Sequence, residues 1–350
     1  MTAHRVALIT EFGGPEVLNV LSRPRPSPAA SDVLVEVMAC GVNPHDVWVR
    51  SGRRAGVCLP LVPGVEAVGI VREVGVAVRQ WQPGDRVCVT PFVPCGDCIT
   101  CSTGSPTACP RGQMIGQHRD GGYGQFVSLP ERGLVRIPDR IPWLEAAALP
   151  VGYGTAFRAL FTRAGLQATQ TVVVSGAAGG LGIAAVALAA MAGAHVIATT
   201  NRQCESALLA LGADRVVTRT VPAVRIAVDE ATGGRGADVV LDHAGGWAAG
   251  LELLRPGGVL VNCGAGALRP ATVDPRALYP AERSIVGSIV ATRPEIERVM
   301  ELAKLGRLRP VIAQTYALDE IAEAHRRLAG SSYFGKLIVL PRESSLDSQH

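Results

Sequence analysis

The stretch from Thr171 to Thr200 contains no Asp, Glu, Lys or Arg, and it limits the possible folds more than any other part of the chain. Its length would be enough for one membrane-spanning helix. However, a run of β-branched residues is followed by a glycine-rich turn and then by an alanine-rich run. This order predicts a strand, a turn and a buried helix, so we expect no membrane span.

This unit begins a regular alternation of strand-like and helical segments. The strand-like runs are Thr171–Ser175, His195–Thr200, Arg215–Val217, Ala237–Asp242, Gly258–Asn262 and Ser284–Ile289. Helical stretches lie between them, and such an alternation is typical of an α/β fold with a doubly wound parallel sheet.

The residues on either side of this region follow other patterns. Before about residue 145 the chain is expected to be β-rich, because Val33, Val35 and Val37 recur with period two and Gly/Pro turns separate short apolar runs. After about residue 290 two helices are expected, and Thr292 and Glu295 have the spacing of a capping box at the start of the first. A chain of 350 residues has room for two domains.

Composition and charge exclude several classes of protein. The chain has 34 Lys and Arg against 30 Asp and Glu, a net charge of +4 that is too small for a nucleic-acid-binding surface. A hydrophobic content of 48% excludes a disordered chain. The first residues carry no signal-peptide pattern. We expect a cytoplasmic protein that acts on a small molecule, with no nucleic-acid or membrane partner.

The turn after the first strand of the alternating region carries a glycine pattern suited to a dinucleotide. Gly179 and Gly182 have the spacings at which the backbone approaches a pyrophosphate and at which helix and strand pack closely, while Ala177 stands at the first glycine position. The helix that follows offers free N–H groups to phosphate. We therefore predict cofactor binding by Gly179, Gly180 and Leu181. The alternative is a glycine turn that serves packing alone.

The end of the next strand is expected to select the cofactor. An acidic residue there would bind a ribose 2′-hydroxyl, but this chain reads Thr199-Thr200-Asn201-Arg202. Arg202 has the charge to bind a 2′-phosphate, with Thr200 beside it. The prediction is NADP(H). The alternative is that Arg202 is a solvated loop charge.

Four cysteines lie close together in a loop rich in Gly and Pro. Cys95, Cys98, Cys101 and Cys109 have spacings that allow four thiolates to surround one Zn²⁺ tetrahedrally. Since no coordination position is left open, we predict one structural zinc per chain. A pair of disulfides is the alternative, which is uncommon in cytosolic proteins.

Together these features resemble the medium-chain dehydrogenase/reductase superfamily, which contains the zinc alcohol dehydrogenases and the quinone oxidoreductases. The resemblance implies a GroES-like β-barrel catalytic domain with an inserted Rossmann domain. The expected boundaries are 1–148 for the catalytic domain, with the zinc lobe at 95–109, 149–290 for the NADP(H)-binding domain, 291–341 for a return to the catalytic domain, and 342–350 for a tail.

The resemblance breaks where the alcohol dehydrogenases hold a second, catalytic zinc. Asn43, Val65 and Ala147 stand at the three ligand positions. Val and Ala cannot bind zinc, and Asn is a poor ligand for it. We therefore expect no catalytic metal, as in the zinc-free quinone oxidoreductase branch, and Glu66 is expected to keep a structural hydrogen bond.

The chemistry expected without that metal is conjugate reduction. Hydride transfer to an activated C=C of an enone, enoyl thioester or quinone leaves an enolate that hydrogen-bond donors can stabilise. One alternative is a zinc-independent carbonyl or alcohol dehydrogenase that uses His45 as its electrophile or acid. Another is a non-redox NADP(H)-binding protein, cyclase or isomerase on the same fold.

The resemblance also suggests catalytic residues. Asn43 would line the vacated pocket and donate to the substrate oxygen, or else cap the loop. His45 would protonate the enolate, although a structural surface histidine is the alternative. Asp46 would orient its neighbours, and Trp48 would form a stacking wall or belong to the core.

The remaining expectations also come from the resemblance. Thr155 would lie toward the nicotinamide end of the cofactor, Cys263 near its carboxamide, and Lys336 near the cofactor cleft. The apolar edge strand at 284–290 would pair across a two-fold axis, which predicts a homodimer.

Overall fold

A computed structural model describes residues 3–201, 203–264, 272–330 and 333–342 of the chain. The chain divides into two compact units. The first unit is formed by Met1–Val151 and Ala291–His350, and the second by Gly152–Val290. The second unit is therefore inserted into the sequence of the first. The expected boundary after residue 148 lies close to this division, and most of the expected tail, 343–350, lies outside the described residues.

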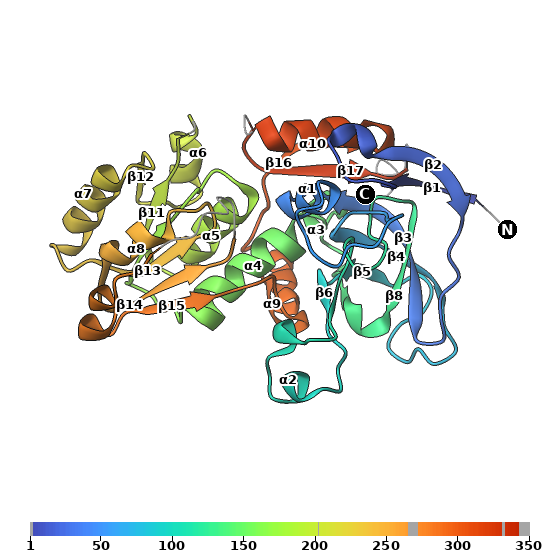
Figure 1. Ribbon diagram of the computed structural model, residues 1–350, viewed down its shortest axis with the longest axis horizontal. Coiled ribbons are helices and arrows are strands. Elements are labelled where there is room, and N and C mark those ends of the chain that lie inside the picture. The colour runs from blue at the N-terminus through green and yellow to red at the C-terminus, as the bar shows by residue number, and fades with distance from the viewer. Residues whose placement is uncertain (1–2, 202, 265–271, 331–332, 343–350) are drawn as a thin grey trace. The chain divides into compact units, whose positions relative to one another are not determined.

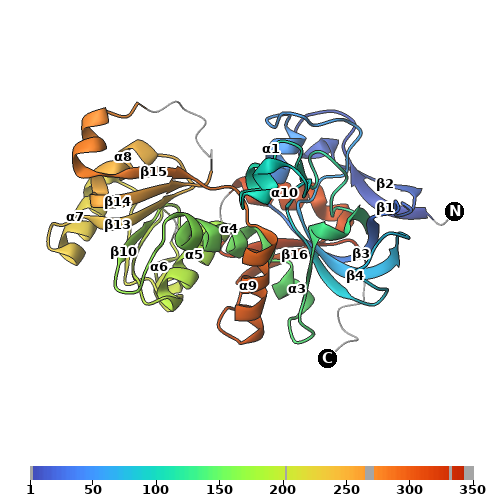
Figure 2. The ribbon, with the colours of Figure 1, turned by 90° about the horizontal axis from the view of Figure 1, so that it is seen from below.

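The second unit is built on a six-stranded sheet in which all neighbours are parallel, in the order β12-β11-β10-β13-β14-β15. This is the order of a doubly wound dinucleotide-binding sheet, with the reversal between β10 and β13, and it confirms the predicted fold class. Figure 1 labels β11, β12, β13, β14 and β15 of this sheet. Figure 2 shows β10, β13, β14 and β15 side by side. The strands are β10 (Thr171–Val174), β11 (His195–Thr199), β12 (Arg215–Val217), β13 (Ala237–Asp242), β14 (Leu254–Asn262) and β15 (Ser284–Gly287).

Helices separate these strands, as the alternation predicted. Their bounds are α4 (Gly154–Phe157), α5 (Gly180–Met191), α6 (Glu205–Ala210), α7 (Val221–Thr232) and α8 (Trp247–Leu253), with short helical turns at Arg158–Arg163, Pro275–Ala277 and Tyr279–Ala281. One face of the sheet packs through Val173, Ile197 and Val240 against Val228 of α7. Burial of this apolar face drives the unit to fold.

The uncharged stretch forms β10, α5 and β11, as expected. Helix α5 is apolar on nearly every face and is mostly buried, which explains why it carries no charged residue. Among the described residues no helix is both long and apolar enough to cross a membrane.

The first unit contains a seven-stranded sheet with the order β16-β17-β3-β4-β5-β9, in which β8 also pairs with β3. Its strands are β3 (Asp32–Gly41), β4 (Glu66–Val74), β5 (Arg86–Val89), β8 (Phe126–Pro130), β9 (Leu134–Arg136), β16 (Ile312–Ala317) and β17 (Lys336–Leu340). Two smaller sheets are formed by β1 (Ala3–Leu8) with β2 (Asn19–Pro24) and by β6 (Phe92–Val93) with β7 (Gln113–Met114). The pairing of β17 with β3 brings the chain back to this unit after the inserted one.

Helices of the first unit are short apart from two near its end. They are α1 (Pro44–Arg50), α2 (Ile99–Ser102), α3 (Trp143–Ala146), α9 (Arg293–Lys304) and α10 (Ile321–Gly330), with turns at Pro15–Val17, Pro106–Ala108, Glu131–Gly133, Leu149–Tyr153 and Leu318–Glu320. Helix α9 begins after Thr292, whose N–H and hydroxyl both donate to the Glu295 carboxylate at 2.7 Å. This is the capping interaction predicted from the spacing.

Candidate functional site

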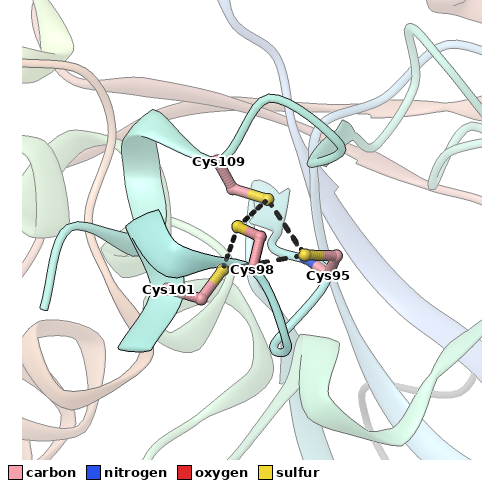
Figure 3. A group of neighbouring side chains, drawn as sticks. All are labelled: Cys95, Cys98, Cys101 and Cys109. Carbon is pink, nitrogen blue, oxygen red and sulfur yellow. Dashed lines mark hydrogen bonds between the residues drawn. The ribbon is translucent and has the colours of Figure 1, made fainter. Parts of the chain in front are cut away.

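The cysteine lobe, residues 95–109, brings its four thiols together around one point. Figure 3 shows the sulfur atoms turned toward one another. The Sγ–Sγ distances are 3.4 Å for Cys95–Cys109, 3.5 Å for Cys98–Cys101 and 3.7 Å for Cys98–Cys109. Bonds of about 2.3 Å to one zinc ion imply sulfur–sulfur separations of about 3.8 Å in a tetrahedron. The geometry therefore suits a closed tetrahedral zinc site.

The four thiols of the lobe differ in acidity. Backbone N–H groups and neighbouring thiols lower the pKa of Cys98 to about 6 and also lower that of Cys109, whereas a hydrogen bond with Asp97 raises the pKa of Cys95 to about 12 and desolvation raises that of Cys101. A thiolate is the form of cysteine that binds zinc. The four residues are free cysteines rather than disulfides.

Within the part of the chain that the structure describes, these four residues form the one group of His, Cys, Asp or Glu with the geometry of a metal site. Val65 and Ala147, at two of the three positions where the resemblance would place catalytic zinc ligands, are fully buried apolar side chains. No second metal site is therefore found among the described residues.

The third of those positions, Asn43, belongs to a buried polar group that we call the Lys336 cluster, formed by Asn43, Glu66 and Lys336. The Lys336 ammonium lies 2.5 Å from Glu66 Oε2 and donates to Asn43 Oδ1 at 2.6 Å. Asn43 Nδ2 donates to Glu66 Oε2 at 2.9 Å. The three side chains are 4%, 0% and 7% exposed, respectively. A charge pair of this kind is expensive to bury, so its presence calls for a reason beyond stability.

The sheet explains why these residues meet. Glu66 and Lys336 are the first residues of β4 and β17, and both strands pair with the end of β3 near Gly41. A Cβ at Gly41 would lie 2.4 Å from Glu66 Oε2 and 2.7 Å from Lys336 Cε. Only glycine leaves room there for both side chains.

The hydrogen bonds of the cluster change the expected role of Asn43. Its Nδ2 donates to Gly41 O at 3.1 Å as well as to Glu66, so both N–H groups of the amide are engaged inside the protein. The remaining Glu66 oxygen accepts from the backbone N–H of Val151 at 2.6 Å, which is a structural hydrogen bond of the kind expected for Glu66. Lys336 has three N–H groups and uses two in the cluster, so within the described residues it retains a donor that Asn43 lacks.

Asp46, at the start of α1, is fully buried, and its carboxylate accepts three hydrogen bonds. It accepts from the N–H of Asn43 at 2.9 Å, from the N–H of Val65 at 3.0 Å, and from the hydroxyl of Tyr123 at 2.9 Å. Burial raises the pKa of its carboxyl to about 6, although these hydrogen bonds oppose the shift. This geometry suits the orienting role predicted for Asp46.

Tyr123 and His325 extend this network and were not identified from the sequence. The Tyr123 hydroxyl lies 3.2 Å from His325 Nε2, and both side chains are fully buried. The two residues are 202 positions apart in the chain, and neither belongs to a recognisable motif. No local sequence signal points to them.

His45 and Trp48 lie on α1, away from the hydrogen bonds of the cluster. His45 Nε2 is buried and has no hydrogen-bond partner among the described residues. Burial, then the charge of Arg54, lower the pKa of His45 to about 3, so the imidazole is neutral at pH 7. The surroundings of His45 therefore do not favour a proton donor. Trp48 has the Arg54 guanidinium 4.6 Å from its ring centre, a cation–π contact on the predicted stacking wall.

In the second unit, the glycine loop between β10 and α5 has the close packing predicted for it. A Cβ at Gly182 would lie 2.5 Å from Gly176 O, whereas one at Gly179 would meet nothing closer than 3.7 Å. Gly182 is therefore required for packing, and Gly179 leaves an open approach to the backbone. The loop is tied to the end of β11, because Ala177 N donates to Thr199 O at 2.9 Å. Gly180 and Leu181 follow as the first residues of α5.

Two buried polar atoms lie beside this loop, at the reversal of strand order. Asp242 Oδ2 and His243 Nδ1, at the end of β13, are buried with no hydrogen-bond partner among the described residues. Buried polar atoms of this kind need a partner, and parallel sheets bind ligands at this crevice. Together with the open glycine loop they fit a dinucleotide. Neither Asp242 nor His243 was identified from the sequence.

The other residues predicted to bind the cofactor are also in the second unit, apart from Lys336. Thr155 is buried in α4, and Thr200 is buried at the end of β11. Cys263 follows β14, and its N–H donates to Asp242 O at 3.1 Å. Burial raises the pKa of the Cys263 thiol to about 12, so it is protonated and unreactive at pH 7. Arg202 lies outside the described residues.

Comparison with known proteins gives matches along the chain. Residues 29–139 match the family described as "Alcohol dehydrogenase GroES-like domain", and residues 180–304 match "Zinc-binding dehydrogenase". A quinone oxidoreductase of Homo sapiens is 30% identical, with 96% of this chain and 97% of that protein covered.

Two further relatives point to related chemistries. An acryloyl-coenzyme A reductase of Metallosphaera sedula is 30% identical, with 90% of this chain and 93% of that protein covered. The crystal structure of an NAD-dependent alcohol dehydrogenase is 35% identical, with a TM-score of 0.91 and 96% and 99% of the two chains covered.

Proposed function

Because the chain belongs to the medium-chain dehydrogenase/reductase superfamily and is an oxidoreductase, we propose that it is an NADPH-dependent reductase of an activated C=C bond that works without a catalytic zinc. The substrate is an enone, an enoyl thioester or a quinone. Among its relatives, the names of the quinone oxidoreductase and the acryloyl-coenzyme A reductase support this class of reaction.

The observation that carries the proposal is the Lys336 cluster. A lysine ammonium joins Asn43 and Glu66, while buried apolar residues stand at the other two positions expected for zinc ligands. An ammonium cannot act as a Lewis acid, but it can donate a hydrogen bond and supply positive charge. That is enough for an enolate, which forms more easily than the alkoxide of an isolated ketone.

The second unit supplies the cofactor site in this proposal. The open backbone at Gly179 and the first N–H groups of α5 would hold the pyrophosphate, and the unpartnered polar atoms of Asp242 and His243 would bind another part of the dinucleotide. When bound, NADPH supplies the hydride and is oxidised to NADP⁺.

The first unit acts on the substrate. Addition of hydride to the β-carbon moves the electron pair of the C=C bond toward the carbonyl oxygen, and the third N–H of Lys336 donates to that oxygen. Glu66 and Asn43 hold the ammonium in place. A proton from water then completes the product at the α-carbon.

The test is NADPH consumption with product identification on an enone, its saturated ketone and a quinone. Reduction of the enone at C=C, with the ketone unchanged, is the expected result. Reduction of the ketone would instead support a zinc-independent carbonyl dehydrogenase, the second candidate, which the likeness to the alcohol dehydrogenase structure favours. Binding of NADPH without turnover of any substrate would contradict both.

We also propose a homodimer formed through β15. Among the described residues this strand is the edge of its sheet, and Ile285 in it and Ile289 just after it are exposed. An apolar edge strand is a ready site for pairing with a second chain. Light scattering coupled to gel filtration should give twice the mass of one chain at micromolar concentration, and a monomer would contradict the proposal.

A further inference from the structure

Arg219 lies at the edge of the second unit's sheet where a dinucleotide is proposed to bind. It stands in the short loop between β12, which ends at Val217, and α7, which begins at Val221. Its backbone N–H donates to Asn201 Oδ1 at 3.0 Å. Asn201 follows β11, so this bond fixes the Arg219 backbone beside the strand end that was expected to select the cofactor.

The Arg219 side chain extends away from that anchor across the sheet. Its Nη2 atom donates to Ala244 O at 3.4 Å and to Gly245 O at 3.3 Å, in the loop after β13. In the sheet, β11 and β10 lie between β12 and β13. The guanidinium therefore reaches over the carboxyl ends of two strands, toward the reversal of strand order where such sheets bind ligands.

The charge of Arg219 is not neutralised within the described part of the chain. It forms no ion pair with a carboxylate there, whereas Arg215 of the same segment pairs with Glu230, and Arg255 pairs with Asp238. Asp242, the acid at the end of β13, accepts from the N–H groups of Ala244 and Gly245 through Oδ1, and its Oδ2 atom has no hydrogen-bond partner among the described residues.

Arg219 is also exposed, and its two carbonyl contacts are at the long end of the hydrogen-bond range. Replacing these two weak hydrogen bonds by bonds to an anion costs little free energy. The positive charge of Arg219 acts on His243 at the end of β13. Burial, and to a smaller extent Arg219, lower the pKa of His243 to about 4 against an opposing effect of Asp242.

We infer that Arg219 binds the 2′-phosphate of NADP(H) and makes this chain prefer NADPH over NADH. The inference rests on the proposed function only for the identity of the dinucleotide. A planar guanidinium binds a phosphate through two parallel hydrogen bonds. Hydrogen bonds to the phosphate dianion are stronger than those to the two neutral carbonyls that it replaces. Asn201 holds the backbone of Arg219 at the ribose end, and the side chain turns from the carbonyls to the phosphate.

The test measures nucleotide binding to the full-length, zinc-loaded protein by calorimetry, without any substrate. The probes are NADPH, NADH, adenosine 2′,5′-bisphosphate and 5′-AMP. In Arg219→Gln, the affinity for the two 2′-phosphorylated probes should fall by about 10- to 100-fold, as expected for lost charged hydrogen bonds. The affinity for NADH and 5′-AMP should change by less than about 3-fold. Arg219→Lys should recover part of the loss.

Arg215→Gln is the matched control, because it removes one exposed arginine from the same strand and loop but one already paired with Glu230. It should leave all four affinities within about 3-fold of the original. An unchanged ratio of NADPH to NADH affinity in Arg219→Gln would overturn the inference, as would a wild-type protein that prefers NADH.

This experiment separates the inference from the proposed reaction. If Arg219→Gln loses its preference for 2′-phosphorylated probes but the wild-type protein reduces no enone or quinone, the inference stands and the proposed function fails. If enones are reduced with NADH and NADPH alike, the reaction stands and the inference fails.

Discussion

The cysteine lobe and the Lys336 cluster lie in the same unit, but they differ in the cation that suits each of them. A metal ion suits the four thiols of the lobe, whereas the cluster contains the ammonium of Lys336. The lobe takes all its polar groups from one loop and gathers four thiols at the spacing of a zinc tetrahedron. The cluster takes Asn43, Glu66 and Lys336 from three segments and contains a cation that belongs to the chain itself.

The difference follows from what each site must neutralise. Thiolates at the partly exposed lobe can be stabilised by a metal ion taken from solution. Glu66 is fully buried, and a buried carboxylate needs a positive partner in every folded molecule. In the described part of the chain a lysine meets that need, and we propose that its remaining N–H donates to the substrate.

The largest effect should come from removing that cation. Lys336→Met leaves Glu66 buried without its ion-pair partner, so we expect the free energy of unfolding to fall by about 3–5 kcal/mol. The value of kcat/KM for enone reduction should fall by about 100-fold or more. Urea unfolding and initial rates measure the two effects.

Two variants sharpen this prediction. Lys304→Met, an exposed lysine on α9, is the matched control and should change neither quantity appreciably. Glu66→Gln combined with Lys336→Met should recover most of the stability and none of the activity. Recovery of activity in the double variant would remove Lys336 from the reaction.

Removing the metal from the lobe should have the next largest effect. Cys98→Ser leaves an incomplete ligand set, so we expect loss of zinc and a fall in unfolding free energy on the order of 4 kcal/mol. Metal analysis should give one zinc per chain for the wild type and much less for the variant. Two zinc ions per wild-type chain would contradict the contrast between the two sites.

Asp46 should give a measurable dependence of stability on pH. Burial raises its pKa from 3.8 to about 6 in the folded chain. The folded protein therefore holds this proton at pH values where the unfolded chain has released it, and Asp46 lowers stability as the pH rises from about 4 to about 6. For a shift of this size, the free energy of unfolding falls by about 3 kcal/mol across this pH range.

Other buried groups act in the opposite direction, so the test is a comparison with Asp46→Asn. Burial lowers the pKa values of His4, His45, His243 and His325, and each of these costs stability as the pH falls below about 6.5. The stability of Asp46→Asn relative to the wild type should rise between pH 4 and pH 6 and level off above. A constant difference across this range would contradict the raised pKa.

The smallest effect is expected at His45. Because its imidazole is neutral at pH 7, His45→Gln should change kcat for enone reduction by less than about 5-fold and leave the pH–rate profile unchanged. Loss of one limb of that profile would restore His45 as an acid and favour the carbonyl dehydrogenase alternative.

The sequence predicted the parts of the site that are local in the chain. The glycine loop at Gly179–Gly182 and the four cysteines each lie within a short segment, so residue spacing alone carries their geometry. The parallel sheet was predicted for the same reason, because each strand and helix has its own pattern.

Side-chain contacts between distant segments were not predicted. Asn43, Glu66 and Lys336 were each singled out, but not as one cluster, because Asn43 and Lys336 are separated by 293 positions. Tyr123 and His325 carry no motif, and Arg219 stands in an ordinary loop. Their roles depend on strand pairing and side-chain direction, which residue spacing does not encode.

The pairing of β17 with β3 has a consequence for how the protein is made. A ribosome releases Asn43 and Glu66 long before it reaches Lys336. Until then Glu66 has no lysine to neutralise it, and β3 lacks one of its neighbours. The inserted unit is continuous in sequence and can fold during synthesis, whereas the first unit can complete the ion pair of Glu66 only after residue 336 has been made. A chain cut short before residue 336 would therefore retain the proposed nucleotide site and lack the group proposed to act on the substrate.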